Sequence, residues 1–143
     1  MLYRKTIEVA CAPAEAFAYV SDFSRVEEWD PGVVESRALD AARTAVGSRF
    51  QLVALFRGKR QRFEYVVAEL EEGRRISLVG ESDKARSRDE IRVDEVAGRT
   101  QISYEADIKL KGVRRAAEPF LGGMFRRMGD AALEGLRKRL DER

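Results

Sequence analysis

The fold is decided by residues 100–140, which read TQISYEADIKL over 100–110 and KGVRRAAEPFLGGMFRRMGDAALEGLRKRL over 111–140. In the first part, apolar and aromatic residues hold the even positions from 102 to 110 and mostly polar residues hold the odd ones. This alternation predicts a strand with one buried face. After Gly112 the apolar residues recur at helical spacing, which predicts one long amphipathic helix over residues 114–140. This helix carries the only large apolar stripe that can cover a one-sided sheet.

Five more strand candidates precede this pair. Turn-forming residues such as Gly47, Gly58 and Gly73 separate them, and no long helical pattern lies between them. Regular spacing of this kind predicts an antiparallel meander rather than parallel strands joined by helices. The candidates are residues 33–39, 48–56, 62–70, 75–80 and 87–93.

The N-terminal part adds one strand and two short helices. Residues 2–10 have strand character, residues 14–20 and 23–28 have short helical patterns, and the cluster WDPG at 29–32 ends the second helix. We therefore predict a single α+β domain over residues 1–143, with about seven strands and one long closing helix.

The composition excludes several kinds of chemistry. The chain has no histidine and one cysteine, Cys11, so it has no Ser-His-Asp or Cys-His catalytic group and no site for a histidine-bound metal. No calcium loop or phosphate loop is present, and we expect no metal and no cofactor. A net charge of +2 argues against nucleic-acid binding. With neither a secretory signal nor an apolar run long enough for membrane insertion, we expect a cytoplasmic protein.

Five short motifs accompany this order of elements. Residues 12–17 read APAEAF, residues 20–23 VSDF, residues 28–31 EWDP, residues 46–50 VGSRF and residues 104–106 YEA. With these motifs the whole chain resembles the START-like superfamily of helix-grip proteins, which includes polyketide cyclase/dehydrase-type sequences. The resemblance implies a curved antiparallel sheet wrapped around the C-terminal helix, with a cavity between them. Members of the superfamily include lipid and hormone carriers, aromatase/cyclases and quinone-binding proteins.

Three residues are candidates for acid–base chemistry in such a cavity. Asp89 shares parity with Ile91 on its strand, so a regular strand would turn its carboxylate inward as a base or hydrogen-bond acceptor. Tyr65 and Tyr104 lie on the apolar parities of their strands and could orient a ligand oxygen or donate a proton. The alternatives are a solvated or arginine-paired Asp89 and two tyrosines that only bury their rings.

The candidates for ligand contact are aromatic and apolar residues on inward faces, together with one arginine that could hold a carboxylate. The alternatives are core packing for the helix residues and a position on the surface for Arg37. These candidates are Trp29, Arg37, Phe63, Ile91, Phe120, Leu121, Met124, Phe125 and Met128.

Three functions follow from these observations. The first is binding of a small hydrophobic molecule, such as a lipid, polyketide, isoprenoid or aromatic compound, inside the cavity. The second is a cyclase/dehydrase-type enzyme that uses Asp89, Tyr65 and Tyr104. The third is a module that binds a partner protein, for which we find no large exposed apolar patch. The sequence is also compatible with a homodimer.

Overall fold

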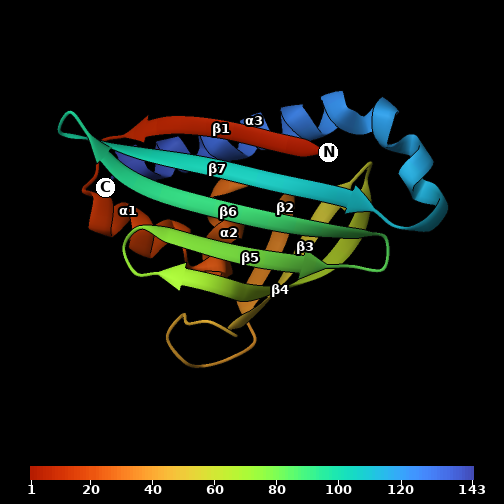
Figure 1. The fold of residues 1–143 in the computed structure, drawn as a ribbon, viewed down its shortest axis with the longest axis horizontal. Coiled ribbons are helices and arrows are strands. Elements are labelled where there is room, and N and C mark those ends of the chain that lie inside the picture. The colour runs from red at the N-terminus through yellow and green to blue at the C-terminus, as the bar shows by residue number, and fades with distance from the viewer.

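Seven antiparallel strands form one curved sheet in the computed structural model, which describes residues 1–143 (Figure 1). Their spatial order is β1-β7-β6-β5-β4-β3-β2, so β2 to β7 form a meander and β1 pairs with β7. This arrangement confirms the predicted α+β fold with a meander and one closing helix. The strands are β1 Leu2–Val9, β2 Val33–Ala38, β3 Arg49–Phe56, β4 Lys59–Glu71, β5 Arg75–Glu81, β6 Ala85–Val96 and β7 Arg99–Leu110.

Two tight turns at opposite ends of the sheet have the same backbone geometry. Arg57-Gly58 joins β3 to β4 with φ angles of 52° and 79°, and Ala97-Gly98 joins β6 to β7 with 53° and 79°. A two-residue turn with positive φ at both positions matches the right-handed twist of the flanking strands. The turns therefore fix the register that places alternate side chains on the concave face.

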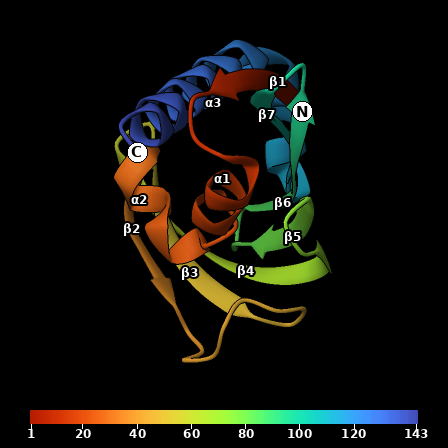
Figure 2. The ribbon, with the colours of Figure 1, turned by 90° about the vertical axis from the view of Figure 1, so that its left-hand side faces the viewer.

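Short helices close one end of the curved sheet. The helix α1 (Pro13–Val20), the 3-10 turn η1 (Phe23–Arg25) and the helix α2 (Val26–Trp29) connect β1 to β2. Figure 2 shows α1 within the curve of the sheet and the long helix α3 (Glu118–Asp141) along its open side. The apolar side chains of α1 and η1 are buried, so this end of the molecule is filled by the hydrophobic core.

The long helix has fully buried side chains only in its C-terminal half. No residue from 118 to 131 is buried, although this part of α3 contacts the sheet where Gly129 lies against the Tyr3 ring of β1. At Gly135 a Cβ would lie 2.0 Å from the backbone oxygen of Trp29, so α3 and α2 approach each other backbone to backbone. The buried residues of α3 are Ala132, Leu133, Leu136 and Leu140.

The structure corrects two predicted helix boundaries. The helix expected over residues 114–140 is divided, because Gly112–Ala117 form the 3-10 turn η2 and α3 begins at Glu118. Pro119 lies in the first turn of α3, where its missing N–H removes no helical hydrogen bond. The helix expected at residues 23–28 is likewise a 3-10 turn followed by one α-helical turn.

Candidate functional site

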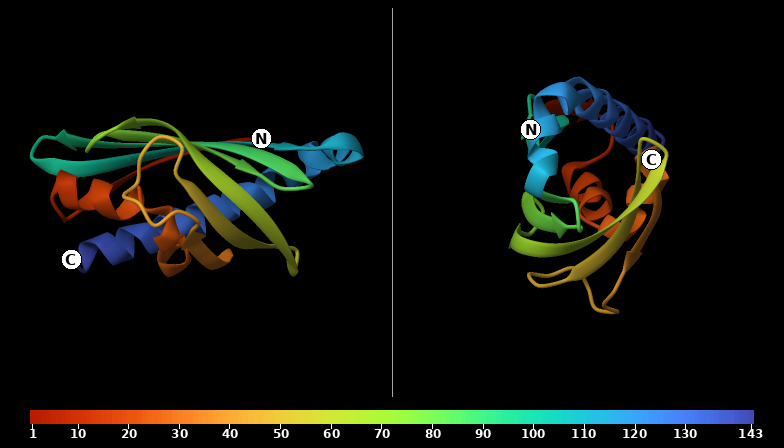
Figure 3. Two further views of the ribbon diagram at one scale, coloured as in Figure 1. Left: turned by 90° about the horizontal axis from the view of Figure 1, so that it is seen from below. Right: turned by 90° about the vertical axis from the view of Figure 1, so that its right-hand side faces the viewer.

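A cavity of about 870 Å³ lies between the sheet and the N-terminal half of α3. It is lined by 36 residues, of which 24 are hydrophobic. Phe23 and Trp29 line its inner end, whereas the β3–β4 turn and η2 line its outer end. The right-hand view in Figure 3 looks at this outer end, which we call the mouth. The volume is within the range of about 300–1,000 Å³ that is typical of small-molecule sites.

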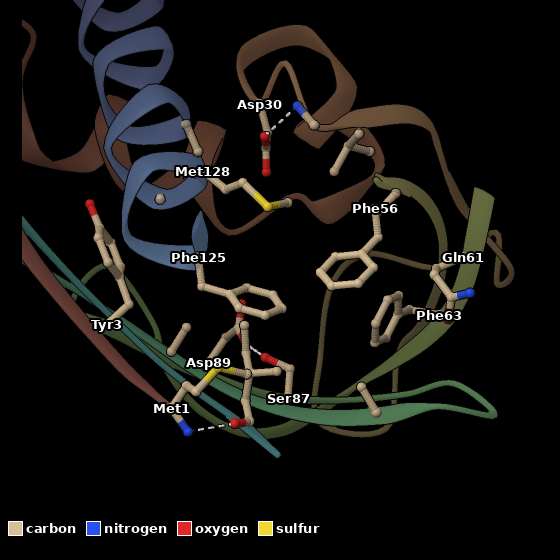
Figure 4. Close-up of a pocket in the computed structure, with 18 of the residues that line it drawn as sticks. Met1, Tyr3, Asp30, Phe56, Gln61, Phe63, Ser87, Asp89, Phe125 and Met128 are labelled. Atoms are coloured by element: carbon tan, nitrogen blue, oxygen red, sulfur yellow. Dashed lines mark hydrogen bonds between the residues drawn. The ribbon is translucent and has the colours of Figure 1, made fainter. Parts of the chain in front are cut away.

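Aromatic side chains form much of the cavity wall. Phe125 of α3 stacks on Phe56 of β3 with ring centroids 5.4 Å apart, so the helix and the sheet meet across the cavity. Phe63 lies beside Tyr65 at 6.0 Å. Figure 4 shows the side chains of Phe125, Phe56 and Met128 converging on the same space. These groups present apolar surface to an occupant and offer few hydrogen bonds.

Asp89 is the centre of a buried polar cluster in this wall. It is 5% exposed, because alternation along β6 turns Ser87, Asp89 and Ile91 toward the concave face. The Ser87 hydroxyl donates to Oδ1 of Asp89 at 2.5 Å, and the Tyr104 hydroxyl donates to Oδ2 at 2.5 Å. Burial raises the pKa of Asp89, and these two hydrogen bonds partly oppose the rise.

The two tyrosines stay protonated over the whole neutral range. Burial raises the pKa of Tyr65 and of Tyr104 well above the ordinary value, and the nearby charge of Asp89 raises both further. Tyr65 is held over Gly80, its cross-strand partner on β5, where a Cβ would lie 2.5 Å from the tyrosine ring. The glycine therefore makes room for the ring beside Ser87 and Asp89.

Asp30 is a second carboxyl group in the cavity, and sequence reasoning missed it. It follows α2 directly, and its Oδ1 accepts the backbone N–H of Gly32 at 2.8 Å. Burial raises the pKa of Asp30 to about 6, and the charge of Asp89 contributes in the same direction. The sequence signal was the WDPG cluster at residues 29–32, which we interpreted only as the end of a helix.

Most of the predicted site residues lie together in the cavity wall. The three acid–base candidates come from strands β4, β6 and β7, and the apolar candidates face them from α3, β4 and the end of α2. The predicted residues that line the cavity are Asp89, Tyr65, Tyr104, Trp29, Phe63, Leu121, Phe125 and Met128.

Arg37 does not lie in the cavity, which corrects its assignment. The register of β2 against β3 shifts between Val33 and Glu35, so the buried positions of β2 are Val33 and Ser36 instead of alternate residues. This bulge turns Arg37 to the outer face, where it is exposed.

Three apolar candidates are also absent from the wall. Phe120 is 86% exposed, and Met124 lies on the same edge of α3, beside the stripe of Leu121, Phe125 and Met128 that faces the cavity. Ile91 is fully buried in the core beyond the inner end of the cavity.

Some wall residues gave no clear signal in the sequence. Ser87 shares the parity of Asp89, and that parity was the only signal that could have identified it.

Trp29 is 4% exposed, and its indole Nε1 has no hydrogen-bond partner in the protein. No group of three or more Cys, Asp and Glu side chains is placed to hold a metal ion. None of the helices has the length and apolar character needed to cross a membrane.

The half-barrel of antiparallel strands, the long C-terminal helix and the cavity between them define the helix-grip fold. A family model described as polyketide cyclase/dehydrase and lipid transport matches residues 3–141. The chain therefore belongs to this family. Comparison with curated proteins gave no match.

Solved structures show the same fold at low sequence identity. The Zhui aromatase/cyclase from a Streptomyces species has a TM-score of 0.83 and 16% identity, over 100% of this chain and 94% of its own. A protein from Thermus thermophilus has a TM-score of 0.82 and 16% identity, over 98% and 97%. A START superfamily protein from Mycobacterium smegmatis has a TM-score of 0.73 and 23% identity, over 99% and 94%.

Proposed function

We propose that the protein binds a small, mainly apolar molecule in the cavity and holds a polar atom of that molecule at the carboxyl group of Asp30. The observation that supports this proposal is a cavity of about 870 Å³ with 24 hydrophobic residues among 36, in which the few polar groups are clustered. Affinity then comes mainly from apolar surface removed from water, at about 25 cal/mol per Å² before the costs of association.

Asp30 offers the free hydrogen-bonding position in this cluster. Both oxygens of Asp89 accept hydroxyl groups of the protein, whereas Asp30 uses only Oδ1, for the Gly32 N–H. Because its pKa is about 6, Asp30 can accept a hydrogen bond as a carboxylate and can donate one when protonated. A ligand hydroxyl or carbonyl group therefore has a partner at Oδ2.

The first test is to look for a bound molecule. Native mass spectrometry of the purified protein, followed by denaturing extraction, shows whether an apolar compound is bound. Trp29, the only tryptophan, lines the cavity, so its fluorescence reports binding directly. Titration with fatty acids, quinones and aromatic polyketides should change this fluorescence in a saturable way.

A matched pair of variants tests whether the cavity is the site. A Cβ at Gly122 meets no atom within 4 Å and Gly122 lines the cavity, so Gly122→Phe fills the space without displacing the backbone. Gly123 is the next residue and does not line the cavity. We expect Gly122→Phe to abolish the fluorescence response and Gly123→Phe to retain it. Equal binding by both variants, or no response of the wild type to any compound, would overturn the proposal.

A second candidate function is a cyclase/dehydrase-type reaction, which is favoured by the hydrogen bond between Tyr104 and Asp89 beside Tyr65. In a dehydration, Asp89 would remove the proton next to a ligand carbonyl, and Tyr65 would protonate the departing hydroxide, so that water leaves. Transfer of the proton from Asp89 to the Tyr65 phenolate would then restore both groups. The raised pKa of Asp89 makes it a stronger base than an ordinary carboxylate. Tyr65 carries its proton at neutral pH because burial raises its pKa well above the ordinary value, and hydroxide is a strong enough base to take that proton.

Replacement of Asp89 distinguishes an enzyme from a carrier. With an aromatic β-hydroxyketone as probe, Asp89→Asn should abolish water loss and change the dissociation constant by less than about threefold, because Asn keeps the shape of the side chain. A wild-type protein that binds the probe without converting it would exclude this second function for that substrate class.

A further inference from the structure

The mouth of the cavity carries a group of basic side chains. They come from the β3–β4 turn, the β5–β6 turn, η2 and α3, which are far apart in the sequence. The two turns and η2 lie around the end of the molecule that faces the viewer in the right-hand view of Figure 3. All of them line the cavity, whereas the only acidic residues that line it are Asp30 and Asp89. We call them the mouth cations: Arg57, Lys59, Lys84, Arg114 and Arg126.

None of the mouth cations forms an ion pair within the protein, although acidic residues lie close by. Glu81, at the end of β5, pairs instead with Arg86 and Lys111, which lie outside the cavity lining. Glu118 accepts the backbone N–H of Leu110. The positive charge at the mouth is therefore left without an internal counter-charge, and the like charges repel each other until an anion joins them.

Charge is thus divided along the length of the cavity. Asp89 of β6 lies five residues after Lys84, which corresponds to about 16 Å at about 3.3 Å per residue. An anionic group at the inner end would meet the carboxyl groups of Asp89 and Asp30, whereas the charged side chains that line the mouth are all cations. The apolar wall of Phe56, Phe125 and Met128 lies between the two ends (Figure 4).

We propose that the ligand is an amphiphile whose apolar body occupies the cavity and whose anionic end, a phosphate, sulfate or carboxylate group, is held by the mouth cations. This inference rests on the proposed function and adds the charge and the orientation of the ligand. Arginine guanidinium groups match the planar oxygen pairs of such anions, and the lysines contribute point charges. The anionic end points to solvent, and the opposite end of the apolar body, which carries the polar atom held at Asp30, lies toward Trp29.

The test compares three probes with the same alkyl chain, each below its critical micelle concentration. Dodecyl phosphate, dodecanoate and dodecan-1-ol differ only in the head group, and calorimetry together with Trp29 fluorescence gives each dissociation constant. We expect both anionic probes to bind at least about tenfold more tightly than the alcohol at low salt. This advantage should shrink as salt is added, because salt screens exposed charges.

The β3–β4 hairpin provides a matched pair of charge reversals. Lys59 faces the cavity, whereas Arg60 and Arg62 of the same hairpin face outward and line no part of it. Arg57→Glu/Lys59→Glu should weaken dodecyl phosphate binding about tenfold or more and leave dodecanol binding unchanged. Arg60→Glu/Arg62→Glu changes the net charge equally and should leave both affinities close to those of the wild type.

Each other outcome contradicts a defined part of this reasoning. If dodecanol binds as tightly as dodecyl phosphate, or both charge reversals weaken dodecyl phosphate binding equally, the mouth cations do not hold an anionic end of the ligand. The proposed function stands in that case. If the protein binds phosphatidylglycerol vesicles but none of the dissolved probes, the mouth cations serve a membrane surface, and the proposal is overturned. If neither probes nor vesicles bind, this proposal is overturned, and the titration with quinones and aromatic polyketides decides the proposed function separately.

Discussion

The Tyr104 hydroxyl donates a hydrogen bond to Oδ2 of Asp89 at 2.5 Å, across the β6–β7 pair. In the register of these strands Tyr104 lies opposite Ile91, two residues along from Asp89, so the long tyrosine side chain reaches the carboxyl group diagonally. The second oxygen accepts the Ser87 hydroxyl. The carboxyl group is therefore held at one orientation in the cavity wall by two hydroxyl groups of the protein.

Replacement of Tyr104 by Phe should raise the pKa of Asp89. The Tyr104 hydrogen bond favours the ionised carboxylate, so its loss leaves burial less opposed. We also expect a loss of stability of about 1–3 kcal/mol from the missing bond. Titration of the Asp89 carboxyl carbon by NMR measures the pKa directly. Tyr3→Phe is the control, because Tyr3 donates to the exposed Asp130 on the outside of the protein. An unchanged or lowered pKa of Asp89 in Tyr104→Phe would contradict the hydrogen bond from Tyr104 to Asp89.

Asp30 should make the stability depend on pH in a defined direction. Its pKa is raised from 3.8 to about 6 in the folded protein, so the folded state holds a proton that the unfolded state has lost. Stability therefore falls as the pH rises from about 4 to about 6, and the full penalty is present above that window. Asp30→Asn removes the cost of burying an ionised carboxylate. The stability of this variant relative to the wild type should therefore be more favourable at pH 7 than at pH 4, by about 1–3 kcal/mol.

Urea unfolding at the two pH values checks this prediction, and Asp40→Asn provides a control of opposite sign. The pKa of Asp40 is lowered by the backbone N–H and the side chain of Arg49, so its contribution is present at neutral pH and lost in acid. Asp40→Asn should therefore cost stability at pH 7 relative to acid pH. If the stability of Asp30→Asn relative to the wild type changes with pH in the same direction as that of Asp40→Asn, then Asp30 is not buried in the cavity wall.

Two glycines that line or adjoin the cavity should respond oppositely to alanine. A Cβ at Gly80 lies 2.5 Å from the Tyr65 ring, so Gly80→Ala must push that ring into the cavity and should cost about 1–3 kcal/mol. A Cβ at Gly122 meets nothing, so Gly122→Ala should gain up to about 1 kcal/mol from helix propensity. Equilibrium unfolding in urea measures both changes. A Gly80→Ala protein as stable as the wild type would show that Tyr65 does not pack against β5.

Gly135 should be the least tolerant glycine of α3. A Cβ there lies 2.0 Å from the backbone oxygen of Trp29, and backbone atoms cannot turn aside as a flexible side chain can. Gly135→Ala should lose about 2–4 kcal/mol despite its better helix propensity, and the Trp29 emission should shift. Gly123→Ala is the control, because its Cβ lies 3.6 Å from the flexible end of Arg127. Retained stability in Gly135→Ala would contradict the close approach of α2 and α3.

The sequence alone predicted the fold because the periodicities of its final third are clear. Alternation over residues 100–110 and the helical stripe after Gly112 depend on local backbone geometry, and both are present in β7 and α3. The same parity rule pointed Asp89, Tyr65 and Tyr104 to the concave face, where they line the cavity. Parity did not determine which face of its strand carries Arg37, because the bulge in β2 depends on the pairing of β2 with β3 and leaves no local signal.

What the sequence determined by itself is the set of elements, their inward faces and the excluded chemistry, since these follow from side-chain types and spacing along the chain. Only the tertiary structure decided which inward faces fill the core and which enclose a cavity. That outcome depends on α3, whose buried side chains begin at Ala132, while its earlier residues line the cavity. It also placed Asp30 beside Asp89 and brought Arg57, Lys84 and Arg114 to one mouth. These are contacts between distant segments, and their energies depend on burial and on distances in space, which no local pattern encodes.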